Sequence, residues 1–236
     1  MIEKVRRFYK HVGIDESDYG FVLLLDAKPA KTPRGAPLAL PTRALAEAVA
    51  EEWRGQGERL EPGTMMLTHL AYSAIDRLGQ DRGKVIEHAL GFGRSDALCY
   101  RAEAPEALAA RQKEIWDPLL HWAFDSLGLR LAADAGIAYI EQPADAFLRM
   151  QELIAQLDDF TLAAFDAAAT ATGSFMLALA LIKGHESAEK AFQAAQLEEL
   201  YQAEVWGRDA EAEARRLRLR EELMAIGRFM GLLGPV

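Results

Sequence analysis

Hydrophobic and polar residues follow two different patterns along this chain, and the pattern changes near residue 60. Residues 19–26 (YGFVLLLD) are bulky throughout, which predicts a β-strand. Three prolines and a glycine within residues 27–37 predict tight turns or an edge hairpin, and residues 38–40 fit a second short strand. The first forty residues therefore carry β and turn signals.

Helical spacing of apolar residues begins immediately afterwards. Leu45, Val49 and Trp53 recur four residues apart, which predicts a helix that starts at Pro41-Thr42. Residues 96–102 fit either a strand or an extended link, and short β signals occur at 129–140. Further helices are expected at residues 65–78, 82–92, 105–127 (with a break before Pro118), 144–157, 161–172, 175–183, 187–205 and 208–230. The predicted fold class is therefore α+β. We expect a small β-rich N-terminal unit with one helix (residues 1–60) and a larger, mainly α-helical body (residues 61–236).

One segment has the length and composition of a membrane span. Residues 160–182 (FTLAAFDAAATATGSFMLALALI) carry a single charge over roughly the thickness of a bilayer. Asp166 lies near its middle, where a carboxylate is costly, and Gly173-Ser174 offers a break. We therefore expect two short helices, the second almost wholly buried, and no membrane insertion.

Charge and cysteine content exclude several classes of protein. Acidic residues outnumber basic ones 36 to 27, for a net charge of -9, which argues against a nucleic-acid binder. The single cysteine, Cys99, excludes an internal disulfide framework and a cysteine-rich zinc site. The first fifteen residues lack the apolar core of a secretory signal, so the cytoplasm is the expected compartment.

Motifs for catalysis or cofactor binding are incomplete. Gly91-Phe92-Gly93 starts like a dinucleotide loop, but it lacks the third glycine and follows a predicted helix. His185-Glu186 starts like a zinc-protease motif, but position 189 is Glu. We expect no catalytic residues, no metal site and no cofactor. The alternative is an enzyme acting on small molecules, with its site between the two predicted units.

The segment 187–206 holds the strongest candidate site, because its predicted helix has two non-polar faces. At 100° per residue, one stripe comprises Phe192, Ala195, Glu199, Gln202 and Trp206. The opposite side comprises Ala194, Leu197, Tyr201 and Val205. A surface helix ordinarily buries one stripe only. The helix is therefore either a central core helix, with Glu199 paired to an arginine, or one that packs on its own core and also contacts a partner.

Several blocks in order resemble a known family. They are residues 7–10 (RFYK), 25–33 (LDAKPAKTP), 40–56 (LPTRALAEAVAEEWRGQ), 66–76 (MLTHLAYSAID), 98–103 (LCYRAE), 116–122 (WDPLLHW), 173–180 (GSFMLALA) and 197–212 (LEELYQAEVWGRDAEA). Each block alone is unspecific, but the ordered set resembles the assembly chaperone of the F-type ATP synthase. That family occurs in mitochondria and alpha-proteobacteria and binds the free alpha subunit.

The resemblance implies a chaperone and not an enzyme. Its client is the unassembled alpha subunit, held without aggregation until the beta subunit replaces the chaperone, which we expect to be a monomer. Within this interpretation the expected partner-binding residues are Glu199, Glu198, Trp206, Phe192, Gln202 and Trp53. Aromatic side chains supply apolar area, and Glu199 supplies orientation. For Trp53, a core position is an equally open interpretation.

Overall fold

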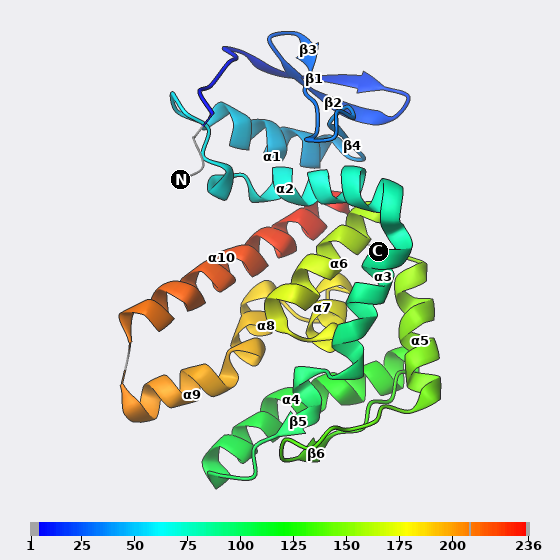
Figure 1. The fold of residues 1–236 in the computed structure, drawn as a ribbon, viewed down its shortest axis with the longest axis vertical. Coiled ribbons are helices and arrows are strands. Elements are labelled where there is room, and N and C mark those ends of the chain that lie inside the picture. Colours follow the sequence, from blue (N-terminus) through cyan, green and yellow to red (C-terminus); the bar gives the residue numbers. More distant parts are fainter. Residues whose placement is uncertain (1–4, 208, 235–236) are drawn as a thin grey trace. The chain divides into compact units, whose positions relative to one another are not determined.

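The computed structural model describes residues 5–207 and 209–234 (Figure 1). Packing divides the chain into two compact units. Unit 1 comprises Met1–Arg82, Asp159–Ala164 and Arg228–Val236, and unit 2 comprises Gly83–Asp158 and Phe165–Gly227. The division into a β-rich unit at residues 1–60 and a helical domain at residues 61–236 stays a prediction.

Unit 1 contains a four-stranded antiparallel sheet. Its strands are β1 (Val12–Ser17), β2 (Gly20–Leu25), β3 (Lys28–Pro29) and β4 (Ala39–Leu40). Strand β1 pairs with β2 along its whole length, whereas β3 and β4 pair with opposite ends of β2. The strands predicted at 19–26 and 38–40 are confirmed as β2 and β4. Strand β1 was not singled out by the sequence, because its second half is polar and exposed.

The turn between β2 and β3 has an unusual backbone. Asp26 and Ala27 have φ angles of 49° and 64°, in the left-handed region that glycine or asparagine normally occupies. The Asp26 carboxylate accepts hydrogen bonds from the backbone N–H groups of Lys10 at 3.0 Å and His11 at 2.9 Å. The hydrogen bond from His11, and to a lesser extent that from Lys10, lowers the pKa of Asp26. The chain before β1 thereby ties down the turn.

Helix α1 (Arg43–Arg54) packs against β1 and β2 and begins where the sequence predicted. The hydroxyl of Thr42 accepts a hydrogen bond from Leu45 N at 3.1 Å and so caps the helix. Leu45, Val49 and Trp53 are buried on one face, as their spacing predicts. On the same helix, Glu52 accepts hydrogen bonds at 2.8 Å from the N–H groups that open the next helix, α2 (Met66–Tyr72).

Unit 2 is mainly helical, although α3, α6 and α10 each contribute residues to both units. The helices are α3 (Gly79–Arg94), α4 (Glu106–Leu127), α5 (Ala144–Ala155), α6 (Asp159–Thr172), α7 (Phe175–Ile182), α8 (Ala188–Ala195), α9 (Leu197–Trp206) and α10 (Ala210–Leu233). Two-residue strands β5 (Tyr100–Arg101) and β6 (Asp134–Ala135) pair in parallel. The small N-terminal sheet followed by a helical body confirms the predicted α+β class.

The apolar segment 160–182 folds as two helices, as predicted. Helix α6 ends at Gly173, whose φ of 67° stops the helix, and Ser174 caps α7 through its hydroxyl. All eight residues of α7 are buried. Across residues 5–207 and 209–234, no helix combines the length and the apolar character that a membrane crossing needs.

Two helix predictions were wrong in detail. Helix α4 runs through Pro118 without the predicted break. The single helix predicted at 187–205 is instead two helices, because Gln196 leaves helical geometry with φ -103° and ψ 14°. Phe192 therefore lies on α8, whereas Glu199, Gln202 and Trp206 lie on α9, and the continuous stripe from 192 to 206 does not exist.

Candidate functional site

Helix α9 carries the predicted site residues that are exposed to solvent. Of its ten residues, all of which are described, only Leu197 is buried. At the other end, Val205 and Trp206 are 55% and 78% exposed. The helix stops at Gly207, whose φ of 96° is available to glycine at low cost. Val205 and Trp206 thus place two exposed apolar side chains next to each other in sequence at the end of α9.

The first turn of α9 is fixed by a buried amide on α4. Gln112 is fully buried, and its Nε2 donates a hydrogen bond to Glu198 Oε1 at 2.6 Å. Its Oε1 accepts a hydrogen bond from Ala102 N at 2.8 Å. Both ends of the amide are thus satisfied, as a buried polar group requires. Glu198, expected in the partner site, already has an internal partner.

A second contact between α4 and α9 lies near the exposed end. Arg111 Nη1 lies 2.6 Å from Glu204 Oε2, and its guanidinium lies 5.2 Å from the centre of the Tyr201 ring. The two charged side chains are about half exposed, so solvent screens this pair and it adds little to stability. It does orient α9 on α4 without covering the face that carries Trp206.

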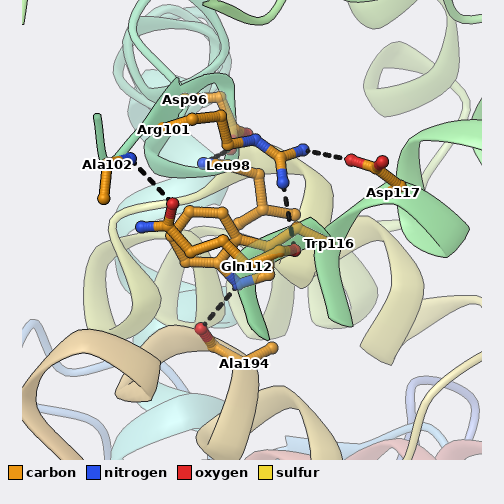
Figure 2. A network of polar contacts seen from close by, with 8 residues as sticks. All are labelled: Asp96, Leu98, Arg101, Ala102, Gln112, Trp116, Asp117 and Ala194. Atoms are coloured by element: carbon orange, nitrogen blue, oxygen red, sulfur yellow. Dashed lines mark hydrogen bonds and ion pairs between the residues drawn. The ribbon is translucent and has the colours of Figure 1, made fainter. Parts of the chain in front are cut away.

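Arg101 and Trp116 extend the network of polar contacts around Gln112 (Figure 2). Arg101 donates hydrogen bonds at 3.0 Å to the backbone oxygen of Gln112 and to Asp117 Oδ1, and it lies over the Trp116 ring. Burial lowers the pKa of Arg101, and the Asp117 carboxylate opposes that effect. Trp116 Nε1 donates to the backbone oxygen of Ala194 at 3.0 Å, which links α4 to α8. Helices α8 and α9 are therefore both anchored on α4.

Glu199, Gln202 and Trp206 share one face of α9, because they are three and four residues apart. Glu199 Oε2 lies 3.8 Å from Arg216 Nη1 on α10. The Arg216 side chain is 10% exposed, whereas that of Glu199 is 46% exposed. Glu199 is thus paired with an arginine, as the core interpretation expects, and is accessible, as the binding interpretation expects. Gln202 is exposed beside it.

The remaining two candidates are buried. Phe192 on α8 is 7% exposed, and Trp53 on α1 is 6% exposed. Trp53 belongs to unit 1, whereas the other five candidates belong to unit 2. The structure therefore brings together Glu199, Gln202 and Trp206 on a surface, with Glu198 at the anchored base of the same helix.

Sequence reasoning missed Asp96, a fully buried carboxylate that holds the start of α7. It accepts hydrogen bonds from Met176 N at 2.9 Å, Leu98 N at 3.0 Å and the Ser174 hydroxyl at 2.8 Å. Burial raises the pKa of Asp96 to about 6, although these hydrogen bonds pull it back. A sequence gives no signal for this role, because the helix it caps lies almost eighty residues away.

The chemistry of these groups suits binding to another protein. Among the residues that the structure describes, His, Cys, Asp and Glu nowhere gather in groups of three or more that could hold a metal ion. The α9 face combines one large aromatic ring, one carboxylate and one amide, which is the mixture typical of protein interfaces. The fold thus presents this mixed face on a helix that α4 supports.

Comparison with known proteins places this chain among the chaperones. Residues 6–124 match the family described as ATP12 chaperone protein. The chain is 40% identical to Paracoccus denitrificans Atp12, whose crystal structure superimposes with a TM-score of 0.91 and covers 97% of this chain and 98% of that one. A putative chaperone from Agrobacterium tumefaciens is 39% identical, with a TM-score of 0.91, over 97% of this chain and 86% of that chain.

A mitochondrial relative extends the comparison to eukaryotes. The protein named Protein atp12, mitochondrial, from Schizosaccharomyces pombe is 28% identical over 214 residues, which is 86% of this chain and 74% of that protein. This chain belongs to the ATP12 chaperone family. The resemblance found from the ordered blocks, to an assembly chaperone of the F-type ATP synthase, is thereby confirmed.

Proposed function

We propose that this chaperone binds the unassembled alpha subunit of the F-type ATP synthase through the exposed face of α9. In this proposal it keeps the alpha subunit from aggregating until the beta subunit takes its place. Family membership supports the chaperone role. The observation that carries the choice of surface is Trp206, which is 78% exposed on a helix anchored by its other end.

A client of this kind needs such a surface. Subunits that form obligate complexes expose a large apolar interface when they are alone. Tryptophan is among the side chains that contribute most to binding free energy when a partner covers them. Trp206 and Val205 offer apolar area at the end of α9, and both are more than half exposed. Burial of these side chains against the client supplies the driving force for binding in this proposal.

Polar groups on the same helix give orientation. Glu199 and Gln202 lie on the same face of α9 as Trp206 and offer a carboxylate and an amide. Because Arg216 already lies 3.8 Å from Glu199, a basic or hydrogen-bonding client group would share that carboxylate with Arg216. We assign Glu198 and Phe192 supporting roles at the base of α9 and on α8. We assign Trp53 to a separate contact in unit 1.

We also propose that the protein acts as a monomer in the cytoplasm, without catalysis and without a cofactor or metal ion. The incomplete dinucleotide and zinc motifs support the part of this proposal that concerns the cofactor and the metal ion. Isothermal titration calorimetry with ATP, ADP and Zn²⁺ should give no binding in the micromolar range. A micromolar affinity for any of the three would contradict this part of the proposal.

The proposed client can be tested directly. Purified chaperone is mixed with isolated alpha subunit under conditions in which the alpha subunit alone aggregates. We expect light scattering to fall in proportion to the chaperone added, and a complex of the two proteins to elute from a sizing column. Unchanged scattering together with no complex would rule out the alpha subunit as the client.

A matched pair of variants locates the surface. Trp206→Ala removes the exposed ring, whereas Met224→Ala removes another exposed apolar side chain, 46% exposed, on α10. We expect Trp206→Ala to lose most of the protection against aggregation and Met224→Ala to keep most of it. Equal loss in both variants would mean that α9 is not the preferred contact.

A further inference from the structure

A pocket of about 410 Å³ opens in unit 1. Its apolar wall includes Phe8, Tyr9, Leu25 and Trp53, and its polar side chains are Asp26, Lys28 and Lys31. Phe8 is 66% exposed and meets Tyr9 edge to face, with 5.4 Å between the ring centres. The pocket is therefore open to solvent and bounded by aromatic rings on one side.

The indole of Trp53 carries an unsatisfied hydrogen-bond donor. Trp53 is only 6% exposed, and within the described part of the chain its Nε1 has no hydrogen-bond partner. The Tyr9 hydroxyl donates a hydrogen bond to the backbone oxygen of Trp53 at 2.7 Å and does not accept one from the indole. A buried N–H without an acceptor is uncommon in folded proteins and costs stability. Because Trp53 also lines the pocket, the N–H signal of its indole reports on what the pocket holds.

The charge at the rim indicates what such a ligand carries. Lys28 and Lys31 are exposed, and no ion pair joins either of them to another described residue. The single acidic side chain of the lining, Asp26, already accepts two backbone hydrogen bonds, from Lys10 and His11. The rim is thus positive in a protein whose net charge is -9. An apolar group with an adjacent carboxylate complements both the wall and the rim.

We propose that this pocket binds a short segment of a client protein in which an apolar side chain stands next to an acidic residue. The apolar side chain packs against Phe8 and Trp53, and the carboxylate lies near Lys28 and Lys31. The inference rests on the proposed chaperone function, since the segment belongs to a client. It is tested with synthetic peptides, so that its failure does not depend on the alpha-subunit experiment.

The test follows the indole N–H signals in the ¹⁵N–¹H NMR spectrum of the full chain. Trp53→Phe, which keeps an aromatic ring but removes the N–H, identifies the Trp53 signal by its disappearance. Three probes are titrated: the blocked peptide acetyl-ELLE-amide, its neutral counterpart acetyl-QLLQ-amide, and inorganic phosphate. We expect the acidic peptide to move the Trp53 signal in a saturable way, the neutral one to bind about three- to tenfold more weakly, and phosphate to leave the signal in place.

Two variants separate the pocket from general charge attraction. Lys28→Gln combined with Lys31→Gln should weaken binding of the acidic peptide by about three- to tenfold. Lys113→Gln, which removes an exposed lysine of α4 in unit 2, should leave it unchanged. Melting curves establish that each variant is folded. The proposal is overturned if the Trp53 signal does not respond to the acidic peptide, if phosphate alone produces the same shift, or if the double variant binds as tightly as the Lys113 variant.

Discussion

Helices α7 and α9 belong to the same unit and are similar in length, yet they meet solvent in opposite ways. All eight residues of α7 are buried, whereas Leu197 is the one buried residue among the ten of α9. Isolated helices of this length are marginal in water, so each depends on its surroundings. Helix α7 takes its stability from burial of its whole surface, and α9 from a few contacts with α4. The first is suited to hold the fold, and the second leaves a face free for a partner.

The starts of the two helices show the same contrast. Ser174 and Asp96 supply acceptors to the first N–H groups of α7. Helix α9 has no side-chain hydrogen bond from its capping residue, Gln196. Its first turn is fixed instead by Gln112, which holds a side chain and not the backbone. A helix end without a capping side chain opens more easily, which is compatible with adjustment to a client.

The largest effect on stability should come from truncating a buried side chain of α7. Leu177→Ala removes a fully buried side chain, so it should lower the free energy of unfolding by about 2–5 kcal/mol. The same type of truncation on α9, Val205→Ala, should change it by less than about 0.5 kcal/mol, because Val205 is 55% exposed. Urea denaturation measures both. Similar losses for the two variants would remove the distinction between the helices.

The next effect concerns the carboxylate that caps α7. Asp96→Asn replaces one acceptor oxygen by an NH₂ group that cannot accept from the nearby N–H groups, so we expect a loss of about 1–3 kcal/mol at low pH. A matched control is Asp209→Asn, which affects an exposed cap of α10 that accepts from Ala212 N at 2.8 Å. The control should cost less, because water replaces the lost bond.

The stability difference between wild type and Asp96→Asn should depend on pH. Since burial raises the folded pKa of Asp96 to about 6, above the unfolded value, the folded state holds its proton more tightly. The wild-type free energy of unfolding should therefore fall, relative to the variant, as the pH rises from about 4 to about 6, and level off above that. Thermal unfolding at several pH values checks this. A wild-type advantage that grows with pH would mean that the hydrogen bonds outweigh desolvation.

The effect of Trp206→Ala should appear in binding and not in stability. The ring is 78% exposed, so its loss should change the melting temperature little. If the client covers Trp206, its removal should weaken client binding by about 2–4 kcal/mol. Calorimetry or sedimentation of the complex measures the affinity. A large drop in melting temperature would show that Trp206 supports the fold.

A milder effect on binding than that of Trp206→Ala is expected from Glu199→Lys. It replaces the carboxylate 3.8 Å from Arg216 by a like charge, so a slight fall in melting temperature is expected. Client binding should weaken by about 1–3 kcal/mol if Glu199 meets a basic or hydrogen-bonding client group. Glu211→Lys, an exposed charge reversal in the first turn of α10, serves as control. If Glu199→Lys melts the protein as severely as Leu177→Ala, Glu199 is a structural residue.

Local signals in the sequence were enough to predict much of this fold. The start of α1 follows from Thr42 and the spacing of Leu45, Val49 and Trp53, and the end of α6 follows from Gly173. These features depend on residues that lie close together in the sequence. The break at Gln196 was not predictable in this way, because glutamine is a good helix former and no glycine or proline marks the position.

The candidate site was harder to predict, because exposure is decided by tertiary packing. Trp53 and Trp206 both stood out as aromatic residues at helical spacing, but one is 6% and the other 78% exposed. Periodicity identifies the faces of a helix and does not say which face another element covers. Gln112 gave no signal at all, since its burial depends on Ala102 and Glu198 from other segments.

The most direct test of the central claim is amide hydrogen exchange of the chaperone with and without the alpha subunit. In the free protein we expect α7 to exchange slowly and α9 quickly, since their burial differs so strongly. On addition of the alpha subunit, residues 197–206 should gain protection, while residues 175–182 remain as slow as before. If the complex forms and residues 197–206 exchange as quickly as in the free protein, α9 is not the surface that holds the client.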